Sequence, residues 1–125
     1  MDKRFIKLTT LSGFLFFLLA VALGAFAAHG LKGHISGKYL QTFQTGVTYQ
    51  FYHSIALVLL APLAHTFQKE FRISYFFYLL GIIFFSLNCY LYALTTYKMF
   101  AMLVPIGGIS FMIGHMSSIY KIIKD

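Results

Sequence analysis

Imidazole, amide and phenol side chains are the groups of this chain that could do chemistry in apolar surroundings. Tyr49, Gln50 and His53 lie four and three residues apart, so they share one face of a helix. Asn88 and Tyr90 follow in a later apolar run, at depths that could meet them. The sequence predicts a polar cluster that either hydrogen-bonds neighbouring helices or binds the polar head of a small ligand. Its predicted members are His29, Gln44, Tyr49, Gln50, His53, Asn88 and Tyr90.

Carboxylates are missing from the apolar parts of the sequence. The three acidic residues, Asp2, Glu70 and Asp125, all lie outside the long apolar runs. Pumps, proton relays and many ion-coupled transporters use a buried carboxylate, and hydrolases use one as acid or base. The sequence therefore argues against proton-driven transport and hydrolysis, and we expect that the protein is not an enzyme.

Five histidines raise the question of a metal or haem site. His65 and His115 are both expected toward the inner side of the membrane, which makes them a pair that could flank a haem. His53 has no partner expected at its own depth, and His29 and His34 are five residues apart, a spacing that does not share a helix face. The single cysteine lies in an apolar run, where it is expected to pack as a small hydrophobe. No set of zinc ligands is complete, so we expect no metal and no cofactor.

The composition decides what kind of protein must position these groups. Of 125 residues, 59% are hydrophobic and only 10% are charged, which is too little polar surface for a soluble domain of this size. The formal net charge is +7. In a membrane protein such a charge points to anionic lipids as partners, and nucleic acid is not expected.

Four runs without charge are each long enough to cross a bilayer, which takes about 20 apolar residues. The sequence therefore predicts an all-α membrane protein with four transmembrane helices in one bundle, and no separate soluble domain. The predicted crossings are approximately residues 8–28, 49–67, 73–94 and 99–119.

A short amphipathic helix is also predicted between the first and second crossings, over about residues 36–45. Apolar residues recur there at helical spacing, and Ser36 could cap the first turn. Continued unbroken from Ser36 to Phe67, such a helix would be about 48 Å long, well beyond the hydrocarbon thickness. We therefore expect an interfacial helix, a break at Gly46, and then the second crossing.

The basic residues predict the orientation. If the four runs alternate, seven Lys and Arg lie on the side of the termini and three on the other, which favours both termini in the cytoplasm. The N-terminus imitates a signal peptide ending in Ala25-Phe26-Ala27. Its apolar run of about 20 residues is longer than the 7 to 15 of a signal peptide, so we expect it to be retained.

Two of the predicted crossings carry small residues at spacings that allow helices to approach closely. Such positions serve either packing within the monomer, or packing against a protein partner or a second copy. The predicted packing residues are Ala20, Gly24 and Ala28 on the first crossing, and Gly107, Ser110 and Gly114 on the fourth.

Two blocks of the sequence resemble the signature of a small bacterial membrane family named domain of unknown function family 423. These blocks are Gly24-Ala25-Phe26-Ala27-Ala28-His29-Gly30-Leu31 and Phe43-Gln44-Thr45-Gly46-Val47-Thr48-Tyr49-Gln50-Phe51-Tyr52-His53. The pattern continues with Phe85-Ser86, Tyr90-Leu91-Tyr92-Ala93-Leu94, Pro105-Ile106-Gly107-Gly108 and Gly114. The chain departs from it at Leu87, Asn88 and His115. The resemblance implies a multi-pass protein of the bacterial plasma membrane, and it brings no established activity, substrate or cofactor.

Two functions follow as hypotheses. The first is a non-enzymatic interaction protein, such as an accessory subunit or assembly factor of a larger membrane complex, because catalytic constellations are lacking and small-residue faces are present. The second is a protein that binds or carries a small molecule, lipid or quinone at the polar cluster, in the outer half of the bundle.

Overall fold

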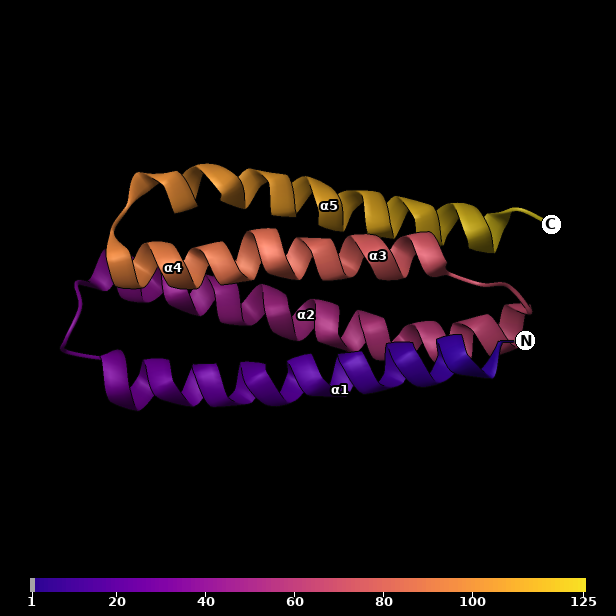
Figure 1. Ribbon diagram of the computed structural model, residues 1–125, viewed down its shortest axis with the longest axis horizontal. Coiled ribbons are helices and arrows are strands. Elements are labelled where there is room, and N and C mark those ends of the chain that lie inside the picture. The colour runs from indigo at the N-terminus through magenta and orange to yellow at the C-terminus, as the bar shows by residue number, and fades with distance from the viewer. Residues whose placement is uncertain (1) are drawn as a thin grey trace.

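The computed structural model describes residues 2–125, and these form long helices joined by short connections (Figure 1). Two of the crossings contain a π-helical segment, labelled η. The elements are α1 (Lys3–Phe26), η1 (Ala27–Leu31), α2 (Gly37–Phe67), α3 (Arg72–Gly81), η2 (Ile82–Leu87), α4 (Asn88–Thr95) and α5 (Lys98–Ile123).

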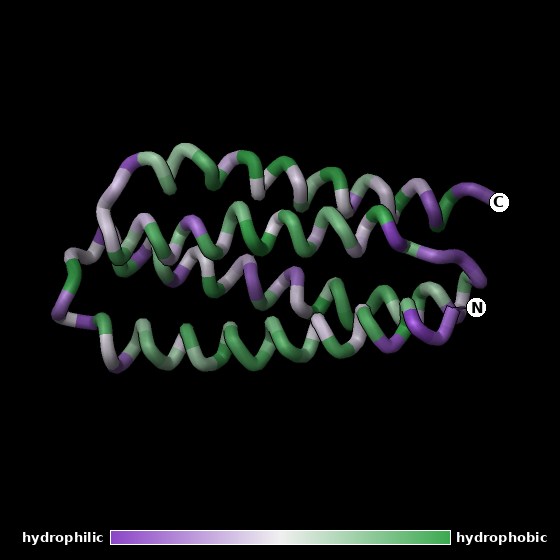
Figure 2. The backbone as a smooth tube through the Cα atoms, viewed as in Figure 1, coloured by the Kyte–Doolittle hydropathy of each residue, from purple (hydrophilic) through white to green (hydrophobic). Residues whose placement is uncertain are grey.

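The predicted all-α architecture with four membrane-spanning helices is confirmed. Four helical stretches are long and apolar enough to cross a bilayer: Lys3–Leu31, Gly37–Phe67, Arg72–Thr95 and Lys98–Ile123. Both termini lie at the same end of the molecule (Figure 1). Hydrophilic residues gather near the two ends of the helices, and the middle is mostly hydrophobic (Figure 2).

The expected break at Gly46 is wrong, because α2 is one continuous helix of 31 residues. The helix predicted over 36–45 is its first part. Gly46 serves close packing: a Cβ there would lie 2.9 Å from the Cβ of Cys89, and the Gly46 carbonyl accepts a hydrogen bond from Ser86 (2.7 Å). A helix of this length is about 46 Å long, so it must tilt or extend beyond the hydrocarbon core.

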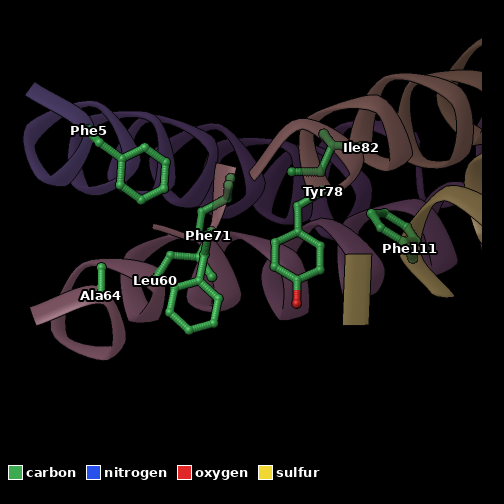
Figure 3. Close-up of a cluster of buried hydrophobic side chains, with 8 residues drawn as sticks. Phe5, Leu60, Ala64, Phe71, Tyr78, Ile82 and Phe111 are labelled. Atoms are coloured by element: carbon green, nitrogen blue, oxygen red, sulfur yellow. The ribbon is translucent and has the colours of Figure 1, made fainter. Parts of the chain in front are cut away.

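The four crossings are arranged with α1 and α5 at opposite edges and α2 and α3–η2–α4 between them (Figure 1). α1 packs mainly on α2, and α5 packs on α3, η2 and α4. One apolar cluster fills the end near the termini, where it includes Phe5, Leu60, Phe71 and Tyr78 (Figure 3). A second cluster, around Phe43, lies toward the other end. α2 contributes side chains to both clusters.

The predicted packing residues of the fourth crossing all face the third. Gly107, Ser110 and Gly114 are buried, and a Cβ on Gly107 would lie 2.2 Å from the backbone nitrogen of Phe85. Gly114 lies against the Tyr78 ring in the same way, because a Cβ on Gly114 would lie only 2.6 Å from Cε1 of that ring. α5 can approach the third crossing this closely only because these side chains are small.

On the first crossing, Ala20 is fully buried and Gly24 faces Val47, but Ala28 is exposed and takes no part in the contact. Seven residues make nearly two full turns of an α-helix, so Ala27 returns to the face of Ala20, whereas Ala28 lies about 80° beyond that face. Ala27 is accordingly buried in place of Ala28.

Candidate functional site

Two imidazoles from different helices meet in the middle of the bundle. Nε2 of His53 on α2 lies 3.0 Å from Nε2 of His115 on α5, within hydrogen-bonding distance. The expectation that His53 has no partner at its own depth was therefore wrong. It came from the assumed break at Gly46, which set His53 close to the start of a crossing. In the continuous helix it comes 16 residues after Gly37, and His115 comes 17 residues after Lys98, so both rings lie about 25 Å along their helices.

A series of hydroxyl groups continues from this pair toward the end that carries the termini. The hydroxyl of Tyr78 on α3 lies 3.0 Å from Nδ1 of His115 and 3.1 Å from the hydroxyl of Ser118. Ser118 in turn donates to the hydroxyl of Ser74 (2.7 Å). We call these five residues, His53, His115, Tyr78, Ser118 and Ser74, the histidine chain. It links α2, α5 and α3.

One backbone carbonyl fixes which ring nitrogens carry protons when both imidazoles are neutral. Nδ1 of His53 lies 2.8 Å from the carbonyl oxygen of Tyr49, which only accepts, so Nδ1 must be the donor. Nε2 of His53 is then an acceptor, and Nε2 of His115 donates to it. That leaves Nδ1 of His115 as the acceptor for the Tyr78 hydroxyl. The hydrogen-bond partners thus assign the tautomer of each ring.

A cavity of about 340 Å³ adjoins the imidazole pair. The ring of Phe111 stacks on His53 with centroids 3.5 Å apart, and the ring of Tyr49 packs on Phe85 at 4.5 Å. His115 is exposed on α5, so the cavity reaches the side of the molecule that faces the bilayer. Its lining residues are Tyr49, His53, Phe85, Gly108, Phe111, Met112 and His115.

A second polar group joins α2 to α1 and α4. The Gln50 amide nitrogen donates to the carbonyl of Phe16 (2.8 Å), and the Gln50 amide oxygen accepts from the hydroxyl of Tyr90 (2.6 Å). Gln50 and Tyr90 are both buried. They form part of the floor of a groove of about 390 Å³ whose other walls are apolar side chains of α1, α2, η2 and α4. We call this the glutamine group.

The remaining predicted members lie apart from both groups. Asn88 is buried, but its amide donates to the carbonyl of Phe84 in its own crossing (2.8 Å), where the backbone leaves the π-helical segment. His29 and Gln44 are exposed and line neither cavity. The predicted cluster is therefore divided between two sites, with Tyr49 and His53 in one and Gln50 and Tyr90 in the other.

Sequence reasoning left Tyr78, Ser74 and Ser118 out of the site, and considered His115 only as a haem ligand with His65. His65 is exposed near the end of α2. A usable signal was present, because Ser74 and Tyr78 are four residues apart and His115 and Ser118 three. Each pair therefore occupies one helix face within an apolar run.

The charged groups gather at the end of the molecule near the termini. Arg72 pairs with Asp2 (2.5 Å) and with Glu70 (2.6 Å). The Arg4 backbone N–H and the Arg72 guanidinium hold the pKa of Asp2 below its ordinary value, and Arg72 does the same for the pKa of Glu70. Within residues 2–125 no three His, Cys, Asp or Glu side chains come together in a way that could hold a metal ion.

The amino-acid sequence of this chain is similar to those of known bacterial proteins. The family model described as protein of unknown function (DUF423) matches residues 23–108. A UPF0382 membrane protein of Haemophilus influenzae is 39% identical over 125 residues, which is 100% of this chain and 98% of the relative. One from Staphylococcus aureus is 40% identical over 108 residues (86% and 88%), and UPF0382 membrane protein YwdK of Bacillus subtilis is 38% identical over 109 (86% and 89%). No solved structure matches the chain.

Proposed function

The chain belongs to the DUF423 family of multi-pass membrane proteins, and from that premise we propose that it is a non-enzymatic protein that binds a small ligand beside His53 and His115. The observation that carries this proposal is the hydrogen-bonded imidazole pair at the wall of a cavity in the middle of the bundle. Polar groups are costly at that depth, so a pair that borders open space is a candidate for binding.

The chemistry of the walls favours a quinone-like ligand. Aromatic rings of Phe85 and Phe111 suit a flat ring, and a ligand carbonyl oxygen would accept the Nε2–H of His115 in place of Nε2 of His53. The cavity meets the bilayer beside exposed His115, so an apolar tail can extend into lipid. The same N–H donors could also bind a lipid head group, which is the other candidate ligand.

The test is binding of a short-chain benzoquinone to the protein in nanodiscs, measured by calorimetry. His53→Ala should abolish binding and leave the helix content unchanged. The matched control is His65→Ala, because His65 is exposed near the end of the same helix. Equal binding by both variants, or none by the wild type at millimolar quinone, would contradict the proposal. Binding of a phospholipid that displaces the quinone would identify the head group as ligand.

A second proposed role is that of an accessory subunit or assembly factor, or of a homo-oligomer. The first crossing supports this role, because only 17% of its most apolar stretch is buried. Leu18, 66% exposed, and the groove between α1 and α4 are therefore available to a partner helix. Gentle purification from native membranes should then recover a stoichiometric partner or a dimer, and repeated recovery of the monomer alone would refute this role.

We also propose that the end with the termini faces the cytoplasm and contacts anionic lipid. The basic residues at this end outnumber those at the other, which supports that orientation. A reporter fused after Asp125 should be active only if it is one that works in the cytoplasm. The basic residues of the terminal end are Lys3, Arg4, Lys7, Lys69, Arg72, Lys121 and Lys124.

A further inference from the structure

The members of the histidine chain are all groups that can both donate and accept a hydrogen bond. We propose that they form a one-sided proton path from the charged end of the bundle to the cavity, and that the imidazole pair stores a single proton. The proposal concerns the protein without ligand, so it goes beyond ligand binding and does not depend on it.

The path is continuous in the structure. Its links measure 2.7 Å from Ser118 to Ser74, 3.1 Å from Ser118 to Tyr78, 3.0 Å from Tyr78 to His115 and 3.0 Å from His115 to His53. Proton transfer along hydrogen bonds needs separations of this kind. Ser118 is half-buried and lies one turn before Lys121, so the path begins close to the charged end.

The hydrogen bonds allow the pair one proton and not two. In the neutral state Nδ1 of His115 accepts from Tyr78, and in the singly protonated state it donates to the Tyr78 oxygen, so the links from Tyr78 to His115 and from His115 to His53 are kept. With both rings protonated, two N–H groups would face each other at Nε2 and the link between His53 and His115 would break. The geometry therefore stores one proton on the pair.

The movement of protons balances without any other reactant. A proton from water binds the hydroxyl of half-buried Ser118, and each hydroxyl then passes its own proton to the next group. Tyr78 gives its proton to Nδ1 of His115 and regains one from Ser118, whose hydroxyl rotates from Ser74 toward Tyr78 to donate it. The positive charge ends on the imidazole pair, and no covalent bond other than O–H and N–H changes.

The path ends at the cavity. Nδ1 of His53 donates to the Tyr49 carbonyl, and a backbone carbonyl cannot pass a proton on. The groups that face the two rings are Tyr49 from α2, Tyr78 from α3, Phe85 from η2 and Phe111 from α5. Among residues 2–125, no acidic or basic side chain other than the two imidazoles lines this cavity. The path therefore delivers protons to the cavity and does not carry them across the membrane.

In the sequence, the absence of carboxylates from the apolar runs argues against a proton relay. It does not exclude a path built from imidazole and hydroxyl groups. Imidazole can gain and lose a proton at its ring nitrogens, and hydroxyl groups can pass protons while staying neutral. The path needs no acidic residue, because imidazole and hydroxyl side chains from facing helices supply all of its groups.

Nitrogen-15 NMR of the protein in bilayers tests the proposal. With ¹⁵N-labelled histidine, His53 should carry its proton on Nδ1 and His115 on Nε2, and the two Nε2 nuclei should show coupling across their hydrogen bond. On acidification the pair should take up one proton with the coupling kept. Uptake of two protons by independent rings, or the opposite tautomers, would overturn the proposal.

The path itself is tested by removing one link. Tyr78→Phe should slow, by about tenfold or more, the exchange with solvent of the proton that the singly protonated pair carries on Nδ1 of His115. Tyr120→Phe is the matched control, because Tyr120 is an exposed tyrosine two residues beyond Ser118 on α5. Unchanged exchange in Tyr78→Phe would show that protons reach the pair by another way.

Should Tyr78→Phe fail to fold, Ser118→Ala gives the same test. It cuts the path one step earlier, and Ser117→Ala is its control, because Ser117 neighbours Ser118 and has no side-chain hydrogen bond within the described residues. Slower exchange in Ser118→Ala alone is the expected result, and equal exchange in both variants would refute the path. Vesicles containing the wild type should show no added proton leak, and a leak would contradict the one-sided arrangement.

Discussion

The glutamine group and the histidine chain both connect α2 to its neighbours, and they differ in how their hydrogen bonds end. Gln50 donates to the carbonyl of Phe16 and accepts from Tyr90, so both polar atoms of its amide are paired, and within residues 2–125 no further hydrogen bond extends from the side chains of Gln50 and Tyr90. His53 instead bonds to His115, a group that can donate at either ring nitrogen, and further hydroxyls follow.

This difference shows that burial of a polar group within the membrane does not by itself mark a chemical site. A buried amide with both atoms paired fixes the positions of three helices, because any rearrangement would leave a polar atom unpaired in apolar surroundings. The histidine chain can move its protons and keep its bonds. The glutamine group is therefore a structural junction, and the histidine chain can carry chemistry.

The largest effect is expected from Gly107→Ala, which should break the histidine chain and spare the glutamine group. The added methyl would meet backbone atoms of Phe84 and Phe85, so α5 must move away from η2 and carry His115 away from His53. We expect a loss of about 1–3 kcal/mol in the free energy of unfolding, measured in bicelles. The coupling between the two imidazoles should disappear.

Gly108→Ala is the matched control, because its added methyl would meet only a side-chain atom of Phe85, at 3.9 Å. It should leave the free energy of unfolding unchanged, or raise it by up to about 1 kcal/mol through the gain in helix propensity. If both variants lose the same stability, close approach at Gly107 is not what holds α5 in place.

A smaller effect is expected from Tyr90→Phe, which should disturb the glutamine group and spare the histidine chain. The ring keeps its packing on Phe43, but the Gln50 amide oxygen loses its donor. Hydrogen bonds between membrane helices are worth about 1 kcal/mol, and we expect a loss of that size in the free energy of unfolding. Tyr92→Phe is the control, since the Tyr92 hydroxyl has no hydrogen bond within residues 2–125. A change in the His53 or His115 tautomer in Tyr90→Phe would show that the two groups are coupled.

The four crossings could be predicted because a helix that spans the bilayer needs a long run without charge, and such runs are visible directly in the sequence. The two polar groups could not, although Gln50 and His53 were both identified. They lie on one helix face three residues apart, yet they bond to opposite neighbours. Which neighbour each meets depends on the order in which the helices pack, and periodicity carries no information about that order.

The depth of each residue in the membrane was the other quantity that the sequence did not provide. A break is predicted at Gly46 because an unbroken helix from Ser36 to Phe67 exceeds the hydrocarbon thickness, but in lipid a glycine also lets another backbone come close. That one choice moved His53 away from His115. The contact of Gly46 with Ser86 and Cys89 depends on a facing helix, so the sequence of α2 alone could not reveal it.

The smallest effect is expected at the charged end, where the paired groups are in contact with water, unlike the two polar groups inside the bundle. Arg72 pairs with Asp2 and Glu70, whose pKa values lie below their ordinary values of 3.8 and 4.5. Because both pKa values are lower in the folded state, the pairs stabilise the protein above about pH 4, and this contribution is lost as the pH falls through the folded-state values. All three side chains are about one-third exposed or more, so salt should weaken the pairs.

Unfolding measured between pH 6 and pH 3 should therefore show a slight loss of stability in the wild type and a flatter profile in Arg72→Gln. Lys98→Gln is the control, because Lys98 is an exposed basic residue at the opposite end of the molecule. High salt should reduce the difference between wild type and Arg72→Gln, while the effects of Tyr90→Phe and Gly107→Ala should not respond to salt, since those contacts are buried away from mobile ions. A salt-dependent effect of Tyr90→Phe would mean that water reaches the glutamine group, and its role as a closed structural junction would then be wrong.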